Sequence, residues 1–350
     1  MKKIKVFFTG GTIAMRIDAD GLLKPAVSGD ELLAQIPELQ HAICVESSQF
    51  SNVSSSQMSG ALCMELRSQI IQTLARADIF GVVIVHGTDT MEESAFLLDA
   101  ALTSAQLAGK TLVMTGAMHS AEHVNGDGLG NLADALAVAS CDDAAGRGVL
   151  VAMAGQIHAA RWVRKMDSVR VDTFASPNDA QTIQGTIARN HIKSAQRGSD
   201  GFKVTFTTVA ARSMPAISLA DSAVALDRVD IISMHSGADG ALLNASIDLG
   251  AKAVVINAVG AGNVNEALFC AIQVVLSKQI PVMISTRCIT GGSLPAYGYV
   301  GGGQQLQKIG ACFAADLPAH KARLYAQLAL AGGYKTPHDF VSLFEQLDSQ

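Results

Sequence analysis

The first half of the chain alternates short apolar runs with longer amphipathic stretches. Each run is rich in β-branched residues, which is typical of a buried strand. The strands expected are residues 4–8, 43–45, 81–85, 112–115 and 149–154, and the helices expected are 30–36, 61–76, 91–102 and 127–140. Strands that alternate with helices predict a mostly parallel sheet with helices on both faces.

A polar interval separates this region from a second region with the same alternation. Residues 190–215 are weakly periodic and contain Gly198, Gly201 and Pro215, which is typical of a linker. Beyond them, the pattern predicts strands at 229–234, 253–256 and 281–285, and helices at 238–249, 264–277, 319–331 and 337–347. We therefore expect an α/β protein with a larger N-terminal domain at 1–193, a linker at 194–216, and a smaller flavodoxin-like α/β domain at 217–350.

Hydroxyl side chains follow glycine turns at the ends of two expected strands. Thr9-Gly10-Gly11-Thr12 ends the first strand, and His86-Gly87-Thr88-Asp89 ends the third. Glycine allows a positive φ and lets backbone or ligand approach closely. Open α/β sheets have their active sites at the carboxyl ends of the strands. Thr12 alone is explained equally well as a helix cap or as a catalytic hydroxyl, and the second turn favours the catalytic interpretation.

Composition and charge exclude several classes of protein. The chain has 350 residues, 49% of them hydrophobic, and a formal net charge of -5, which argues against nucleic acid or an anionic membrane as a partner. No apolar stretch is long enough for a membrane span, and the run after Met1-Lys2-Lys3 is too short for a signal peptide. Six scattered cysteines without a C-x-x-C motif predict reduced core cysteines in a cytoplasmic protein.

Three chemistries compete for the glycine turns. The turns at 9–12 and 260–263 are able to cradle a phosphate, but the sequence has no G-x-x-x-x-G-K-[ST] motif, and the first turn lacks G-x-G-x-x-G. The nine histidines include no H-E-x-x-H and no clustered pair, so we expect no metal. A hydrolase needs an activated nucleophile, a base, an orienting group and oxyanion donors. Thr12, Thr88-Asp89 and Lys165 supply the side chains for such a site.

Two of these segments carry a resemblance to a known family. Thr9-Gly10-Gly11-Thr12-Ile13-Ala14 and His86-Gly87-Thr88-Asp89-Thr90-Met91-Glu92-Glu93 resemble the two signature segments of the bacterial-type L-asparaginase family. Shorter resemblances extend over nearly the whole chain, at 115–118, 127–128, 131–132, 148–150 and 174–178. The resemblance implies hydrolysis of the side-chain amide of asparagine to aspartate and ammonia, with no cofactor.

The resemblance also implies the catalytic roles. Thr12 is expected to be the nucleophile that forms an acyl-enzyme, and Thr88 lies opposite it, hydrogen-bonded toward Lys165, with Asp89 completing the group. A threonine hydroxyl is a poor nucleophile until a neighbour takes its proton, which a lysine does when burial lowers its pKa. Lys165 is preferred to Arg164 for its spacing to the following Asp167-Ser168 pair and to Phe174.

Substrate recognition is implied for a second set of residues. Asp89 is expected to pair with the substrate's α-ammonium group, and Ser55, with its neighbour Ser56, to bind the α-carboxylate. Backbone at Gly11, Gly87 and Ala117 is expected to bind the carboxylate or to stabilise the oxyanion.

The sequence departs from the family pattern at several positions. Many members carry a tyrosine on a loop near the nucleophile, where this chain has Leu22, and no tyrosine precedes Tyr297. We hypothesise that Tyr297 reaches the site of a neighbouring subunit in a homo-oligomer, a dimer or tetramer. Gln57 replaces an aspartate, and His119-Ser120 replaces Arg-Pro. The Asn and Glu that periplasmic members receive from a neighbouring subunit have no clear match.

These departures leave three functions open. The first is an asparaginase, and the second is a hydrolase of glutamine or another carboxamide. The third is a non-catalytic amino-acid sensor that keeps the fold, against which the joint presence of Thr12, Thr88, Asp89 and Lys165 argues. The related amidotransferase subunit usually has an extra N-terminal domain, which the closeness of Thr12 to Met1 disfavours.

Overall fold

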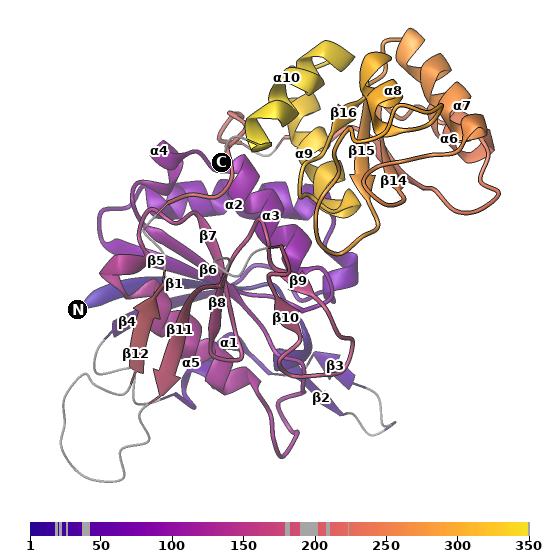
Figure 1. Ribbon diagram of the computed structural model, residues 1–350. Coiled ribbons are helices and arrows are strands. Elements are labelled where there is room, and N and C mark those ends of the chain that lie inside the picture. The colour runs from indigo at the N-terminus through magenta and orange to yellow at the C-terminus, as the bar shows by residue number, and fades with distance from the viewer. Residues whose placement is uncertain are drawn as a thin grey trace. The chain divides into compact units, whose positions relative to one another are not determined.

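The computed structural model describes residues 1–17, 20, 23–25, 27–36, 43–178, 183–189, 202–207, 211–222 and 224–348. The chain forms two compact units (Figure 1). One comprises Met1–Ser213 and Asp221–Ala223, and the other comprises Met214–Ala220 and Val224–Gln350. Each unit is built around its own β-sheet, so each is described by itself.

The first unit contains an eight-stranded sheet in the order β12-β11-β8-β7-β6-β5-β1-β4. Five neighbouring strands are parallel: β1 (Lys2–Phe8), β4 (Ile43–Gln49), β5 (Ile79–Val85), β6 (Thr111–Thr115) and β7 (Val149–Met153). The other three extend it antiparallel: β8 (Gln156–Ala159), β11 (Ile183–Arg189) and β12 (Phe202–Phe206). The mostly parallel sheet expected from the sequence is therefore confirmed.

Helices cover both faces of this sheet. Alternation along β1 sends Ile4, Val6 and Phe8 to one core and Phe7 to the other. The first core is completed by α1 (Gly29–Leu33) and α5 (Gly128–Ala139), and the second by α2 (Gly60–Leu74) and α3 (Met91–Ala101). The short α4 (Ser104–Leu107) and the 3-10 turns Thr12–Ala14, Ser55–Gln57 and Asp142–Ala144 lie in the connections.

The three antiparallel strands were not expected. β12 lies within the range 194–216 that the polar composition indicated as a linker, yet it forms the last strand of the sheet. Its sequence alternates Phe202, Val204 and Phe206 with polar residues, and these three side chains pack against the first core. A period of two is the signal of a half-buried strand, and the high polarity of the surrounding segment obscured it.

Two small hairpins lie outside the large sheet. β2 (Met15–Ile17) pairs with β3 (Leu23–Pro25), and β9 (Arg164–Lys165) pairs with β10 (Phe174–Ala175). The second hairpin lies in the charged stretch that follows β8, and its base is fixed by Val163 and Phe174, both buried in the second core. Lys165 is therefore carried by a hairpin and not by the sheet.

The second unit contains a four-stranded parallel sheet in sequential order. Its strands are β13 (Val229–Ser233), β14 (Ala253–Ala258), β15 (Val282–Thr286) and β16 (Cys312–Phe313). The helices are α6 (Ala241–Asp248), α7 (Glu266–Ser277), α8 (Gly303–Lys308), α9 (Ala319–Ala331) and α10 (Pro337–Asp348). Leu243, Leu268 and Ile272 fill the core between α6, α7 and the strands. The second α/β fold is confirmed, and α8 and β16 were not anticipated.

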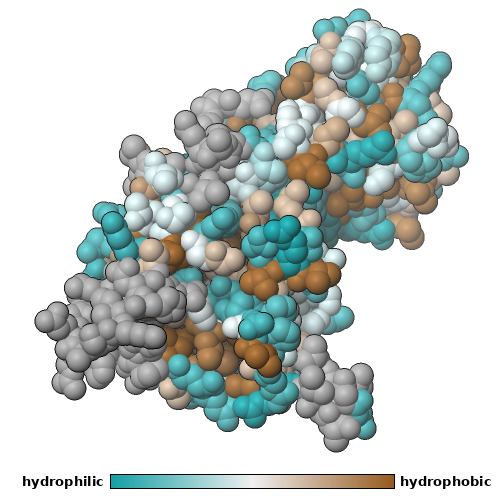
Figure 2. Space-filling view, turned by 60° about the horizontal axis from the view of Figure 1, so that its bottom comes forward, coloured by the Kyte–Doolittle hydropathy of each residue, from teal (hydrophilic) through white to brown (hydrophobic). Residues whose placement is uncertain are grey.

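Polar and apolar side chains intermingle on the face of the molecule in Figure 2.

All six cysteines are free thiols that form no disulfide bond. The expectation of core cysteines is wrong for Cys44, Cys270 and Cys288, which are exposed, because apolar neighbours in sequence do not fix which way a side chain points. Among the helices in the described part of the chain, none is both long and apolar enough to cross a membrane.

Candidate active site

The first glycine turn is locked against the neighbouring strand and turn. Gly10 and Gly11 have φ angles of 115° and 97°, which are strained for any residue with a side chain. A Cβ at Gly11 would lie 2.6 Å from the Gly87 Cα. The residue that caps the following 3-10 turn is Gly11, and Thr12 is the first residue inside the turn. The helix-cap explanation of Thr12 is therefore wrong, and its hydroxyl is available for another role.

The second turn packs on the serine-rich segment. Ser55 is buried, and its Oγ accepts a 3.2 Å hydrogen bond from the Asp89 N–H. The Thr90 hydroxyl donates to the Ser55 carbonyl at 2.7 Å. A Cβ at Gly87 would lie 2.9 Å from the Ser55 Oγ. Ser55 therefore lies directly beside the turn that carries Thr88 and Asp89.

Lys165 connects the hairpin to this second turn at two points. Its Nζ donates to the Thr88 Oγ1 at 2.9 Å and to the Asp89 Oδ1 at 2.6 Å. Its backbone N–H donates to the Glu92 Oε2 at 2.8 Å. The Lys165 side chain is 14% exposed and that of Asp89 is 71% exposed. A hydroxyl, an ammonium group and an accessible carboxylate therefore form one hydrogen-bonded group.

A third turn, at the end of β6, packs against the second turn. The space for a Cβ at Gly116 is filled by the His86 carbonyl oxygen. Ala117, next along the chain, is buried. The Asp127 carboxylate accepts hydrogen bonds from the Met118 and His119 N–H groups at 3.0 and 2.9 Å. The N-terminus of α5 thus fixes the backbone that follows Ala117.

Contacts between α5 and the first turn complete this frame. A Cβ at Gly128 would lie 2.7 Å from the Ile13 Cγ1, so α5 packs directly on the residue after Thr12. The Asn131 Nδ2 donates to the Gly116 carbonyl and to the Asp127 Oδ2, both at 3.0 Å. The packing of Gly128 on Ile13 and the hydrogen bonds of Asn131 therefore connect the turns at residues 10–13 and 116–119 through one helix.

Ser56, Gln57, Leu22 and Tyr297 are the other residues named from the sequence. Ser56 is exposed, and its hydroxyl lies 2.7 Å from that of Ser54. Gln57 is exposed as well. Leu22 lies outside the described residues. Tyr297 belongs to the second unit, where it is 49% exposed and its ring centroid lies 5.8 Å from that of Tyr299.

Three supporting residues were not identified from sequence. Glu92 and Asn131 occur in segments that carry the family resemblance, but a glutamate in the first turn of a helix is expected from the helix dipole alone. His86 is almost fully buried, and burial lowers its pKa below 6.5. Only the three-dimensional contacts distinguish these residues from ordinary helix and core positions.

The histidines require one correction. His119 and His123 were not expected to form a pair, but their ring centroids are 4.0 Å apart in the exposed loop after Met118. Their spacing of four residues was the available signal. In the described ranges, no group of three or more His, Cys, Asp or Glu side chains is arranged to hold a metal ion.

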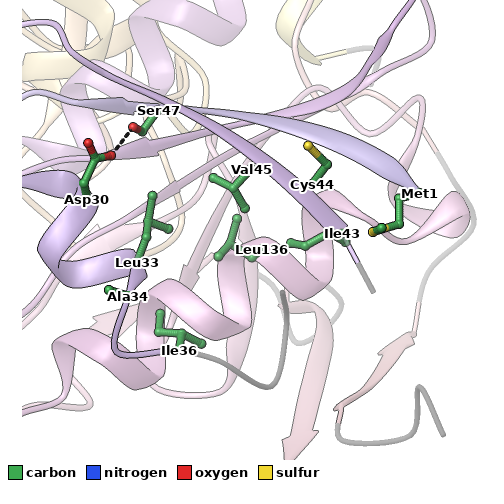
Figure 3. Close-up of a pocket in the computed structure, with 10 residues that line it drawn as sticks. All are labelled: Met1, Asp30, Leu33, Ala34, Ile36, Ile43, Cys44, Val45, Ser47 and Leu136. Carbon is green, nitrogen blue, oxygen red and sulfur yellow. Dashed lines mark hydrogen bonds between the residues drawn. The ribbon is translucent and has the colours of Figure 1, made fainter. Parts of the chain in front are cut away.

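A separate pocket of about 450 Å³ lies between α1, β4 and the side chain of Leu136 on α5 (Figure 3). Apolar residues such as Leu33, Ile43 and Val45 line most of it. At one end, the Ser47 hydroxyl donates to the Asp30 carboxylate. Ser47 and Asp30 form a hydroxyl–carboxylate pair, but the described residues that line this pocket include no lysine, arginine or histidine, so it is a poorer candidate for amide chemistry than the three turns.

Comparison with known proteins relates both units to one family. The family model for "Asparaginase, N-terminal" matches residues 3–198, and the family model for "Glutaminase/Asparaginase C-terminal domain" matches residues 228–344. A probable L-asparaginase of Deinococcus radiodurans is 35% identical over 326 residues, 93% of this chain and 91% of that protein. The glutaminase-asparaginase of Pseudomonas fluorescens biotype A is 26% identical over 94% of this chain and 86% of its own length.

A solved structure resembles the whole fold. The crystal structure of a probable cytoplasmic L-asparaginase from Campylobacter jejuni matches with a TM-score of 0.81 and 29% sequence identity. The match covers 99% of both chains.

Proposed function

The chain belongs to the asparaginase family of amidohydrolases, and we propose that it hydrolyses the side-chain amide of L-asparagine to L-aspartate and ammonia. The observation that carries this proposal is the hydrogen-bonded group of Thr88, Asp89 and Lys165 beside the turn that bears Thr12. It combines the hydroxyl of Thr12 on one glycine turn with a polar, proton-bearing group on the adjacent turn.

The reaction proceeds in two balanced steps. The Thr12 Oγ attacks the amide carbon, the C–N bond breaks, and the hydroxyl proton is transferred to the departing nitrogen, which leaves as ammonia. Water then attacks the resulting ester, releases aspartate and restores the Thr12 hydroxyl. Lys165, held against Thr88 and Asp89, relays the proton, and backbone N–H groups at Gly11, Gly87 and Ala117 stabilise the oxygen that becomes negative.

Substrate binding uses the second turn and the serine-rich segment. The exposed Asp89 carboxylate pairs with the α-ammonium group, while Ser55, already within hydrogen-bond distance of Asp89, binds the α-carboxylate together with Ser56. One oxygen of Asp89 contacts Lys165, so substrate binding and the proton relay share one carboxylate. An amino acid with both charged groups is therefore preferred to a simple amide.

Ammonia release from purified protein tests the proposal. We expect release from asparagine, and loss of activity in the Thr12→Ala and Thr88→Ala variants with the fold retained. Faster release of ammonia from glutamine than from asparagine would favour the glutaminase alternative. The similarity to a glutaminase-asparaginase supports testing this alternative. Release from neither amide would contradict hydrolysis of these substrates, and asparagine binding without turnover would then indicate a sensor.

Tyr297 is proposed to assist Thr12 in a neighbouring subunit of a homodimer or homotetramer. Its ring is half-exposed on the second unit, as a group that serves another subunit must be. Tyr297→Phe is expected to lower turnover, while Tyr299→Phe, whose ring is tilted against that of Tyr297, is the matched control. Unchanged turnover in Tyr297→Phe, or a monomer in light scattering, would contradict this role.

A cytoplasmic location is proposed by analogy with the probable cytoplasmic enzyme of similar fold. Cell fractionation with an antibody to the chain tests it, and recovery from the periplasm or the medium would contradict it.

A further inference from the structure

His86 lies where the three catalytic turns meet. It follows β5 directly, is only 1% exposed, and its N–H donates to the Thr115 carbonyl at 2.8 Å. Its carbonyl oxygen packs against Gly116, and the next residue, Gly87, packs against Gly11. The backbone at residues 86–87 is therefore enclosed on both sides by other turns of the site.

The imidazole ring of His86 has a partner on each nitrogen. Nδ1 lies 2.6 Å from the Gly87 carbonyl oxygen, and Nε2 lies 3.0 Å from the Ser94 Oγ. A carbonyl oxygen only accepts hydrogen bonds, so Nδ1 carries the proton and Nε2 accepts from the Ser94 hydroxyl. The Cys63 Sγ is 3.7 Å from the Ser94 Oγ, so the thiol is able to donate to Ser94. Burial disfavours the charged ring, and in the neutral ring these contacts fit the tautomer that is protonated on Nδ1.

The bond from Nδ1 fixes the orientation of a peptide group in the site. The Gly87–Thr88 peptide is trans, so its carbonyl and its N–H point in opposite directions. Because the carbonyl is held on the buried ring, the Thr88 N–H points away from the ring. Among the described residues, none accepts a hydrogen bond from this N–H. Within the described part of the chain, it is a donor held in place without a protein partner.

Building on the proposed amide hydrolysis, we infer that His86 is a positioning residue whose Nδ1–H holds the Gly87 carbonyl so that the Thr88 N–H faces a substrate oxygen. Both ring nitrogens are occupied and the ring is buried, so His86 does not touch the substrate. Its effect is transmitted through one peptide group. A donor fixed before the reaction requires no reorganisation as the substrate oxygen becomes negative.

A matched pair of variants isolates this hydrogen bond. In His86→Asn, the side-chain amide nitrogen occupies the Nδ1 position and still donates to Gly87, whereas His86→Leu has nearly the same shape and no donor. We expect His86→Asn to retain kcat within about threefold, and His86→Leu to lose kcat and kcat/KM together by about 10- to 100-fold. If the leucine variant does not fold, His86→Gln replaces it, because its carboxamide reaches the Nε2 position and not Gly87.

The outcomes separate this inference from the proposed function. An equal loss of kcat in His86→Asn and His86→Leu, or no loss of kcat in His86→Leu, overturns the role of His86. The activity of the wild-type protein stands in either case. A wild-type protein that releases no ammonia overturns the proposed function and the role of His86 with it. Nitrogen-15 NMR of the imidazole shows which ring nitrogen carries the proton and does not depend on turnover. A ring that is protonated on Nε2 and not on Nδ1 overturns the inference.

Discussion

Glycines at residues 11, 87 and 116 determine how closely the turns of the proposed site approach one another. At each of them, an added Cβ would overlap the backbone or side chain of a neighbouring turn. Gly11 also has a φ of 97°, which disfavours any other residue. The absence of a side chain thus places Thr12 beside the turn of Thr88 and Asp89. At the scale of the residue, the geometry of the site depends on the missing Cβ atom at these three positions.

Gly11→Ala should therefore be more harmful than an ordinary glycine substitution. Gly109 is a matched control, since it has a positive φ of 69° and no atom within 4 Å of an added Cβ. We expect Gly109→Ala to cost about 1 kcal/mol of unfolding free energy, and Gly11→Ala about 3 kcal/mol or more, with activity lost. Urea unfolding and ammonia release measure both effects, and equal stability of the two variants would contradict the packing argument.

His86 should make stability depend on pH. Burial lowers its pKa below 6.5 in the folded chain, so below that pH the unfolded chain takes up a proton that the folded chain resists. The free energy of unfolding therefore keeps its full value above about pH 6.5. It falls as the pH drops toward the folded pKa of His86, by at most about 1.4 kcal/mol per pH unit. Urea unfolding of wild type and His86→Asn should give a stability difference that changes across this window. A constant difference would show that His86 does not titrate on unfolding.

At the scale of elements, the site joins a hairpin to a helix. The hairpin β9–β10 pairs only two residues on each strand, and Glu92 at the start of α3 holds the Lys165 backbone. A hydrogen bond from an amide to a carboxylate is stronger than one between neutral groups. Glu92 thus sets where Lys165 stands relative to Thr88.

Glu92→Ala is expected to lower kcat by about 10-fold, because Lys165 loses a charge-assisted backbone anchor. Glu92→Gln, which keeps an acceptor oxygen, should recover most of the activity, and Glu93→Ala, one position further along α3, should stay close to wild type. Steady-state kinetics with asparagine measure the three variants. Equal activity in Glu92→Ala and Glu93→Ala would exclude the anchoring role.

The same scale explains what the sequence reveals and what it conceals. The five parallel strands and their helices were predictable because their patterns are local and strongly apolar. β8 and β11 are short or part-polar strands whose pairing depends on residues distant in sequence, which no local window reports. Likewise, the turns of Thr12 and Thr88 were recognisable from sequence, whereas the contacts of His86, Glu92 and Asn131 become visible only in three dimensions.

At the scale of the molecule, each of the two units carries three of the six thiols, and one thiol in each unit is buried. Cys63 and Cys312 are buried, and burial raises the pKa of each, that of Cys63 to about 11. A protonated, enclosed thiol is a poor nucleophile. Cys44, Cys270 and Cys288 are exposed.

A chromogenic thiol reagent should therefore modify three thiols first in the native protein and all six after unfolding. Replacing Cys44, Cys270 and Cys288 with serine should remove the fast phase while leaving ammonia release unchanged. A fast reaction of Cys63 or Cys312 in the native chain would show that the core around it opens readily.

The hairpin that carries Lys165 also offers a place to engineer control of the enzyme. Its tip is exposed at Val169, and the Asp167 carboxylate caps the turn by accepting from the Val169 and Arg170 N–H groups at 2.7 and 2.9 Å. Exposed loop tips tolerate inserted domains, and this one lies outside the eight-stranded sheet. A ligand-binding domain inserted at Val169 should leave the fold intact and make ammonia release respond to its ligand. The protein would then work as a biosensor whose output is a change in turnover.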